Sequence, residues 1–110
     1  MSETSWQVFD IDAIREAFSG SEVQYQEFLR VPSLSCGVYH LPAGATDMQT
    51  PHDEDEVYFV LSGKARMKLG DAYEDVVPGK ILYVKATAEH SFFEIEEDMT
   101  LLVFFASALT

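Results

Sequence analysis

From Tyr25 onward, the chain consists of short β-type runs separated by glycine, proline or acidic residues. Such runs are typical of a β-sandwich or β-barrel, because each strand needs a turn before the next one begins. A chain of 110 residues can bury one hydrophobic core but not two. The sequence therefore predicts one all-β domain without an interdomain linker.

Alternation and turn residues locate the strands within this region. Ser62-Gly63 and Gly70-Asp71 predict tight hairpin turns, because glycine accepts the positive φ that such turns require. Residues 64–69 alternate basic and apolar side chains, which places one face in water and the other on a core. The expected strands are 26–30, 34–41, 57–61, 64–69, 73–77, 81–84, 90–95 and 101–105.

The N-terminal region contains the only convincing helix signal. Asp10 can cap a helix in which Ile11, Ile14 and Phe18 recur at helical spacing, and Gly20 follows as a stop. We predict roughly two to three turns here. The expected organisation is a helical segment, residues 1–24, packed on a β-barrel formed by residues 25–110.

The charge balance excludes two classes of partner. The chain carries 19 acidic and 7 basic residues, for a formal net charge of −12. This charge repels nucleic acid phosphates and anionic membrane surfaces. The sequence also shows neither a long apolar run nor a signal-peptide pattern near its first residue, so a cytoplasmic protein is expected.

Three polar residues could form a metal site. His52 stands four residues before Glu56, and His90 begins a β-type run. Two imidazoles and a carboxylate suit Fe, Mn, Ni, Co or Zn rather than Mg or Ca. By spacing alone, solvated loop residues in the acidic run 53–56 are the more frequent explanation of such a pattern.

The wider context of these residues resembles the two motifs of the cupin family. The first match is Gly44-x5-Thr50-x-His52-x3-Glu56-x6-Gly63. The second is Pro78-Gly79-x5-Lys85-x-Thr87-x2-His90-x3-Glu94, in which Lys, Thr and Glu replace the usual Pro, Gly and Asn. The resemblance covers roughly residues 34–105. It implies a double-stranded jelly-roll β-barrel, with the N-terminal helix added to it.

The resemblance also implies that His52, Glu56 and His90 hold one divalent transition metal. The first histidine of the family pattern is absent, and Thr50 or Gln49 stands in its place, depending on the motif spacing. A Gln49 carbonyl oxygen is the better neutral ligand, and water is the alternative fourth contact. Glu94 could accept a hydrogen bond from the ring of His90.

Aromatic and other residues near the motifs have two interpretations. Tyr58 shares a strand face with Glu56, and Phe92 shares one with His90, so both could wall a ligand pocket together with Thr50. Ordinary core packing is the alternative for the two rings. His40 and the single Cys36 are expected to be structural strand residues.

Two functions remain open from the sequence. The first is a metal-dependent enzyme acting on a small molecule, a dioxygenase or isomerase of the cupin type, and the second is a binding or sensor module without turnover. A cupin without metal is the third alternative. Residues 57–61 and 101–105 are apolar on both strand faces, which predicts that a second sheet or a partner subunit covers them. Together with the resemblance to small cupins, this pattern implies a homodimer.

Overall fold

The computed structural model describes residues 5–18, 22–47 and 53–106. Its elements are the helix α1 (Ile11–Glu16) and the strands β1 (Gln24–Val31), β2 (Leu34–Leu41), β3 (Asp55–Leu69), β4 (Ala72–Val76), β5 (Ile81–Val84) and β6 (His90–Ala106). The predicted all-β class is confirmed. In these ranges no helix is long and apolar enough to cross a membrane.

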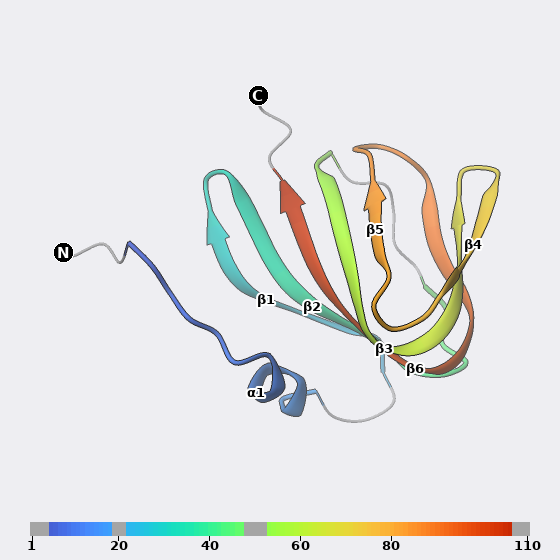
Figure 1. The fold of residues 1–110 in the computed structure, drawn as a ribbon, viewed down its shortest axis with the longest axis horizontal. Helices are drawn as coiled ribbons and strands as arrows, with labels where there is room; N and C mark the ends of the chain where they lie inside the picture. Colours follow the sequence, from blue (N-terminus) through green and yellow to red (C-terminus); the bar gives the residue numbers. More distant parts are fainter. Residues whose placement is uncertain (1–4, 19–21, 48–52, 107–110) are drawn as a thin grey trace.

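All strand pairings are antiparallel, and the sheet curls around a core (Figure 1). The strand order is β1-β2-β6-β3-β4, and β5 pairs with β3 beside this path. The first half of β3 pairs with β5 and with the end of β6, whereas its second half pairs with β4 and the start of β6. The two long strands therefore carry the sheet from one side of the barrel to the other.

The predicted hairpin at Ser62-Gly63 is wrong, because β3 continues through it. Gly63 has the positive φ that the sequence indicated, +100°, but it lies at a series of register shifts between β3 and β6. On β6, Glu94 also has a positive φ, +47°. Such irregularities bend a paired strand instead of ending it. Hence β3 contains both of the predicted strands 57–61 and 64–69, and β6 contains both 90–95 and 101–105.

The other predicted hairpin, at Gly70-Asp71, is confirmed. Leu69 and Ala72 pair across this two-residue loop, and Gly70 has a φ of +59°. The alternation that precedes the loop is also confirmed, since Ala65 and Met67 are buried while Lys64 and Lys68 are exposed. These inward-facing residues join a continuous core inside the curled sheet.

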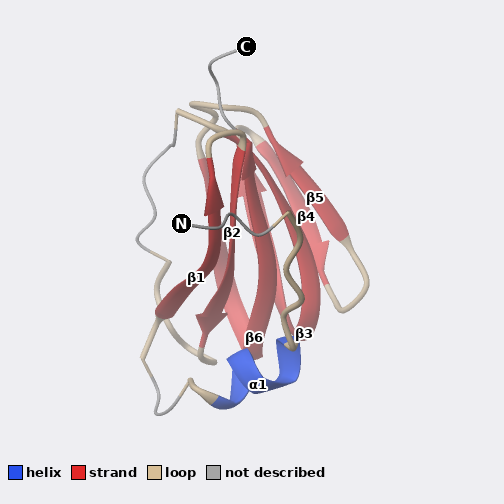
Figure 2. Ribbon diagram, turned by 90° about the vertical axis from the view of Figure 1, so that its left-hand side faces the viewer, coloured by secondary structure: helices blue, strands red, loops and turns tan. Residues whose placement is uncertain are grey.

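The helix α1 lies at one end of the sheet (Figure 2). Asp10 caps it as predicted, because its side chain accepts hydrogen bonds from the backbone N–H groups of Asp12 and Ala13. The helix is shorter than predicted, because the backbone N–H groups after Glu16 donate to the carbonyl three residues earlier, as in a 3₁₀ turn, and not four residues earlier. The predicted stop, Gly20, lies outside the described residues.

Candidate functional site

Glu56 and His90 meet inside the barrel although they stand far apart in the sequence. Glu56 belongs to the inward-facing alternation of β3, and His90 is the first residue of β6. The Oε1 atom of Glu56 lies 2.8 Å from Nε2 of His90, and both side chains are only 1% exposed. The fold thus brings together two of the predicted ligands in a site shielded from water.

The ring of His90 is held in a defined orientation. Its Nδ1 lies 2.9 Å from the carbonyl oxygen of Ala88, which can only accept, so Nδ1 carries a proton. Nε2 therefore faces Glu56 and also lies 3.2 Å from the hydroxyl of Tyr58. Fixing one ring nitrogen on a backbone carbonyl is the usual way to prepare the other as a metal ligand.

Glu94 does not have the role that was expected of it. The carbonyl of Ala88 occupies the position at His90 Nδ1 where the Glu94 carboxylate was predicted. Glu94 itself is exposed. The prediction assumed a regular strand, but the positive φ at Glu94 interrupts the alternation of β6.

Burial and hydrogen bonding act in opposite directions on His90. Burial lowers the pKa of its imidazole, whereas the hydrogen bonds to Glu56 and Ala88 and the charge of Glu56 raise it. The net effect is a pKa above the ordinary value of histidine. Without a metal, His90 and Glu56 thus form a buried ion pair over a wider pH range than a free histidine would allow.

The second carboxylate oxygen of Glu56, Oε2, is buried and has no hydrogen-bond partner among the residues that the structure describes. Buried polar atoms are nearly always paired, so an orphaned carboxylate oxygen calls for an explanation. A cation held by Glu56 and by the Nε2 atom of His90 would satisfy it. The donor set of these two residues therefore fits a divalent transition metal.

The other residues predicted for the site, Gln49, Thr50 and His52, lie outside the described residues. Within residues 5–18, 22–47 and 53–106, no group of three His, Cys, Asp or Glu side chains could hold a metal. The full ligand set of His52, Glu56 and His90, with Gln49 or water, stays a prediction.

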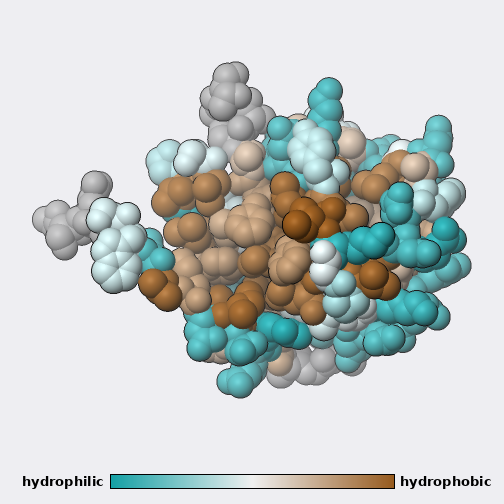
Figure 3. Space-filling view, viewed as in Figure 1, coloured by the Kyte–Doolittle hydropathy of each residue, from teal (hydrophilic) through white to brown (hydrophobic). Residues whose placement is uncertain are grey.

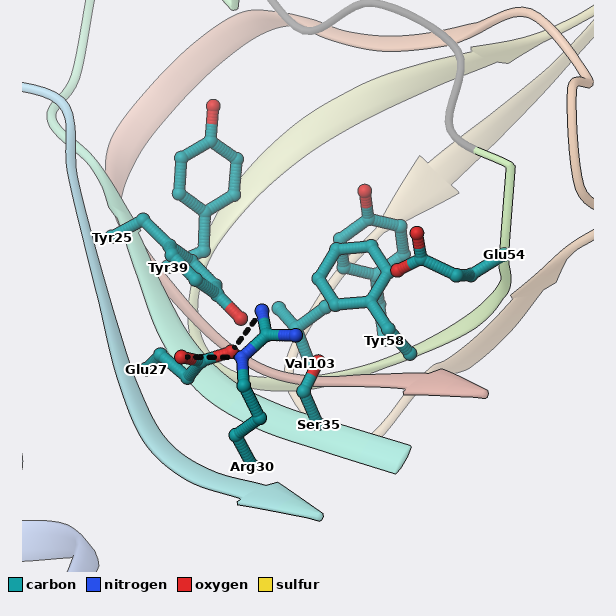
Figure 4. Close-up of a pocket in the computed structure, with 9 residues that line it drawn as sticks. Tyr25, Glu27, Arg30, Ser35, Tyr39, Glu54, Tyr58 and Val103 are labelled. Atoms are coloured by element: carbon teal, nitrogen blue, oxygen red, sulfur yellow. Dashed lines mark hydrogen bonds and ion pairs between the residues drawn. The ribbon is translucent and has the colours of Figure 1, made fainter. Parts of the chain in front are cut away.

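Figure 4 shows a cavity of about 330 Å³ that adjoins this pair through Tyr58. Tyr58 connects the two, since its side chain lines the cavity and its hydroxyl faces His90. Phe92 packs edge-on against Tyr58, with ring centroids 5.2 Å apart, as part of the core. The cavity is lined by Tyr25, Glu27, Arg30, Ser35, Tyr39, Glu54, Tyr58, Val103 and Phe105.

Sequence reasoning missed most of this cavity, and it also missed Asp47. The carboxylate of Asp47 accepts hydrogen bonds from the Tyr39 hydroxyl, at 2.9 Å, and from the backbone N–H of Phe92, at 2.8 Å. It thereby fixes one wall of the cavity next to the start of β6. Alternation along residues 34–41 could have placed Tyr39 on the inner face, but Asp47 stands in a loop without any pattern.

His40 and Cys36 have the structural roles that were expected. The Nδ1 atom of His40 lies 3.3 Å from Thr100 Oγ1, and its ring stacks on Phe18. Cys36 is buried in β2, and burial raises the pKa of its thiol. A raised pKa keeps a thiol protonated and unreactive.

The chain is similar to known proteins in sequence and in fold. The family model of the cupin domain matches residues 37–105. An uncharacterized protein of Streptomyces coelicolor is 41% identical over 98 residues, which cover 89% of this chain and 93% of that protein. This relative carries no stated activity, so it supports the family and not a reaction.

Among solved structures, a cupin superfamily protein from Desulfitobacterium hafniense has a TM-score of 0.73 at 17% identity, covering 84% of this chain and 85% of the other. A DMSP lyase from Ruegeria pomeroyi also has a TM-score of 0.73, at 21% identity. That match covers 79% of this chain but 48% of the lyase, so the chain spans about half of its length. These similarities confirm the predicted jelly-roll fold.

Proposed function

Because this chain belongs to the cupin family, we propose that it binds one divalent transition metal through His52, Glu56 and His90. Gln49 or a water molecule completes the site. The metal lies next to the cavity walled by Tyr58, where a small molecule binds. The orphaned Oε2 atom of Glu56, buried against the prepared Nε2 atom of His90, is the observation that supports this proposal most directly.

A bound metal of this class supplies Lewis acidity, or activates O₂ when its redox chemistry allows. The protein residues have separate tasks. Ala88 and Glu56 keep the His90 ring oriented, and Tyr58 places a hydroxyl between that ring and the cavity. The surrounding core excludes water, which strengthens every charge interaction in the site.

Elemental analysis of protein purified without a histidine tag tests the metal site. We expect about one metal ion per chain, and a loss of most of it in His52→Ala and His90→Ala variants, because each removes a ligand. A His40→Ala variant is the matched control, since His40 lies on the outer face beside Thr100. Metal-free unmodified protein, or equal metal content in all four proteins, contradicts the proposal.

Oxygen consumption separates an enzyme from a binding module. The metal-loaded protein is supplied with panels of small phenols, thiols and keto acids, and O₂ uptake is followed. Uptake that depends on both His90 and one class of substrate supports a dioxygenase-like enzyme. Metal binding without turnover supports the alternative function, a cupin that senses or carries a small ligand.

We also propose that two copies of the chain pair through the outer face of the sheet. Two rows of exposed or partly exposed apolar residues cross three strands there, and Figure 3 shows this face as a broad hydrophobic surface. The rows are Phe104, Val57 and Tyr83, followed by Leu102, Phe59 and Ile81. Because each copy carries a net charge of −12, contact through an uncharged face such as this one brings fewer carboxylates together than contact through a charged face.

Introducing charge into this face tests the dimer. Ile81 and Tyr83 are 68% and 60% exposed, so Ile81→Glu and Tyr83→Glu can be accommodated by the folded monomer. We expect both variants to run as monomers in light scattering where the unmodified protein is a dimer. Tyr73→Glu on β4, where Tyr73 is 53% exposed, should remain dimeric. A monomeric unmodified protein contradicts this assembly.

A further inference from the structure

Aromatic rings form much of the cavity wall. Tyr25, Tyr39, Tyr58 and Phe105 all line it. The ring of Tyr25 lies 6.1 Å from that of Tyr39 and 6.3 Å from that of Phe105, each pair in an edge-on arrangement. Ring faces attract a cation held within about 6 Å of their centres, most strongly where water is excluded. The cavity therefore gathers several aromatic rings around one volume.

Tyr25 occupies its place because of Gly37. A side-chain carbon added at Gly37 would collide with the Tyr25 ring, so the ring lies directly on the bare backbone of β2. Tyr25 belongs to the edge strand β1 and is 43% exposed. It thus forms the outer wall of the cavity, between solvent and the deeper Tyr39.

The charges around the cavity are mainly negative. Glu27 and Glu54 line it together with one cationic residue, Arg30. Arg30 is already paired, because its guanidinium lies 2.7 Å from the carboxylate of Glu27 and extends into solvent. In Figure 4 the Glu54 carboxylate lies on the Tyr58 side of the cavity, away from Arg30. The cavity wall therefore has an excess of negative charge.

Burial is the main cause of the raised pKa values of the tyrosines in the wall, and neighbouring carboxylates add to it. Burial, followed by the charge of Glu27 and smaller contributions from Cys36 and Glu56, raises the pKa of Tyr25 to about 12, although the charge of Arg30 acts in the opposite direction. Burial and the neighbouring Asp47 raise the pKa of Tyr39 as well. Burial opposes a charge of either sign, so only the contributions of Glu27 and Asp47 agree with a negative potential that favours a cation.

We propose that this cavity binds a small organic cation of the methylated ammonium class, with its charged head among Tyr25, Tyr39 and Phe105 and with Glu54 as counter-charge. Because it names the ligand class of the same cavity, this inference rests on the proposed function. A cavity of about 330 Å³ lies at the lower end of the range of about 300–1,000 Å³ for ligand pockets, which suits a small ligand.

Isothermal titration calorimetry with three ligands of the same shape tests the inference. Choline carries a trimethylammonium group, and neohexyl alcohol has an uncharged tert-butyl group in its place. The anion of tert-butylacetic acid keeps the tert-butyl group and carries a negatively charged carboxylate instead of the hydroxyl group. We expect choline to bind about tenfold more tightly than neohexyl alcohol, and tert-butylacetate to be the weakest ligand of metal-free protein. Binding of choline no tighter than the alcohol overturns the inference.

Variants locate the binding site. Tyr25→Leu and Glu54→Gln should each weaken choline binding by roughly three- to tenfold. Because neohexyl alcohol is uncharged, Glu54→Gln should weaken its binding less than it weakens the binding of choline. Gly37→Ala should act like Tyr25→Leu, because the added methyl group displaces the Tyr25 ring. Tyr73→Leu and Glu74→Gln on β4 are matched controls away from the cavity. Choline binding that is unchanged in Tyr25→Leu and Glu54→Gln contradicts the site.

The titrations are performed on chelator-treated protein and on protein reloaded with Zn²⁺, and metal content is measured in both. Selective choline binding by a protein that retains no Zn²⁺ supports this inference and contradicts the metal proposal alone. Zn²⁺ binding at His90 without any preference for choline in either form contradicts this inference alone. The two failures are therefore distinguishable.

Discussion

A Gly63→Ala variant is expected to unfold in urea with a free energy of unfolding about 3 kcal/mol lower than that of the unmodified protein. Two effects combine. Gly63 has a φ of +100°, and an added Cβ would lie 2.5 Å from the Cα of Met99 and 2.6 Å from the carbonyl oxygen of Asp98. These are backbone atoms of β6 in the bend of the barrel, so neither can move aside cheaply.

Gly79→Ala separates the two effects. Gly79 also has a positive φ, +92°, but an added Cβ there would meet no atom within 4 Å. This variant should therefore lose only the backbone contribution, about 1 kcal/mol. Equal losses in the two variants would show that β3 and β6 do not approach each other closely at Gly63.

The same glycine explains where sequence reasoning failed on the fold. A hairpin turn and a bend inside a strand both require a positive φ, so Ser62-Gly63 gives one local signal for two structures. The choice depends on β6, which pairs with β3 on both sides of Gly63 and comes thirty or so residues later in the chain. At Gly70, by contrast, the partner strand follows at once, and the local signal was sufficient.

The candidate site shows a similar division. Glu56 and His90 were predicted because each stands in a sequence motif, and alternation correctly grouped Tyr58 with Glu56. Tyr25 and Tyr39 come from β1 and β2, which reach the site only through the strand order β1-β2-β6-β3. That order depends on pairings between distant segments, and no short pattern records it.

Replacing His90 alone should destabilise the metal-free protein, whereas replacing His90 and Glu56 together should not. His90→Phe alone leaves the buried Glu56 carboxylate without its partner, and we expect a loss of about 3–5 kcal/mol in the free energy of unfolding. In the double variant Glu56→Leu/His90→Phe, apolar groups of similar size replace both charges. We expect its stability to equal or exceed that of the unmodified protein by about 1–4 kcal/mol.

This comparison, made by urea unfolding in the presence of a chelator, decides what the buried pair is for. The ion pair satisfies only one oxygen of Glu56, because Oε2 has no hydrogen-bond partner within residues 5–18, 22–47 and 53–106, so its burial is incompletely compensated there. If the double variant is at least as stable as the unmodified protein and binds no metal, the two residues are retained at a cost to the fold, which is the behaviour of a ligand site. If the double variant is as unstable as His90→Phe alone, the pair supports the barrel itself, and the orphaned oxygen no longer favours a metal.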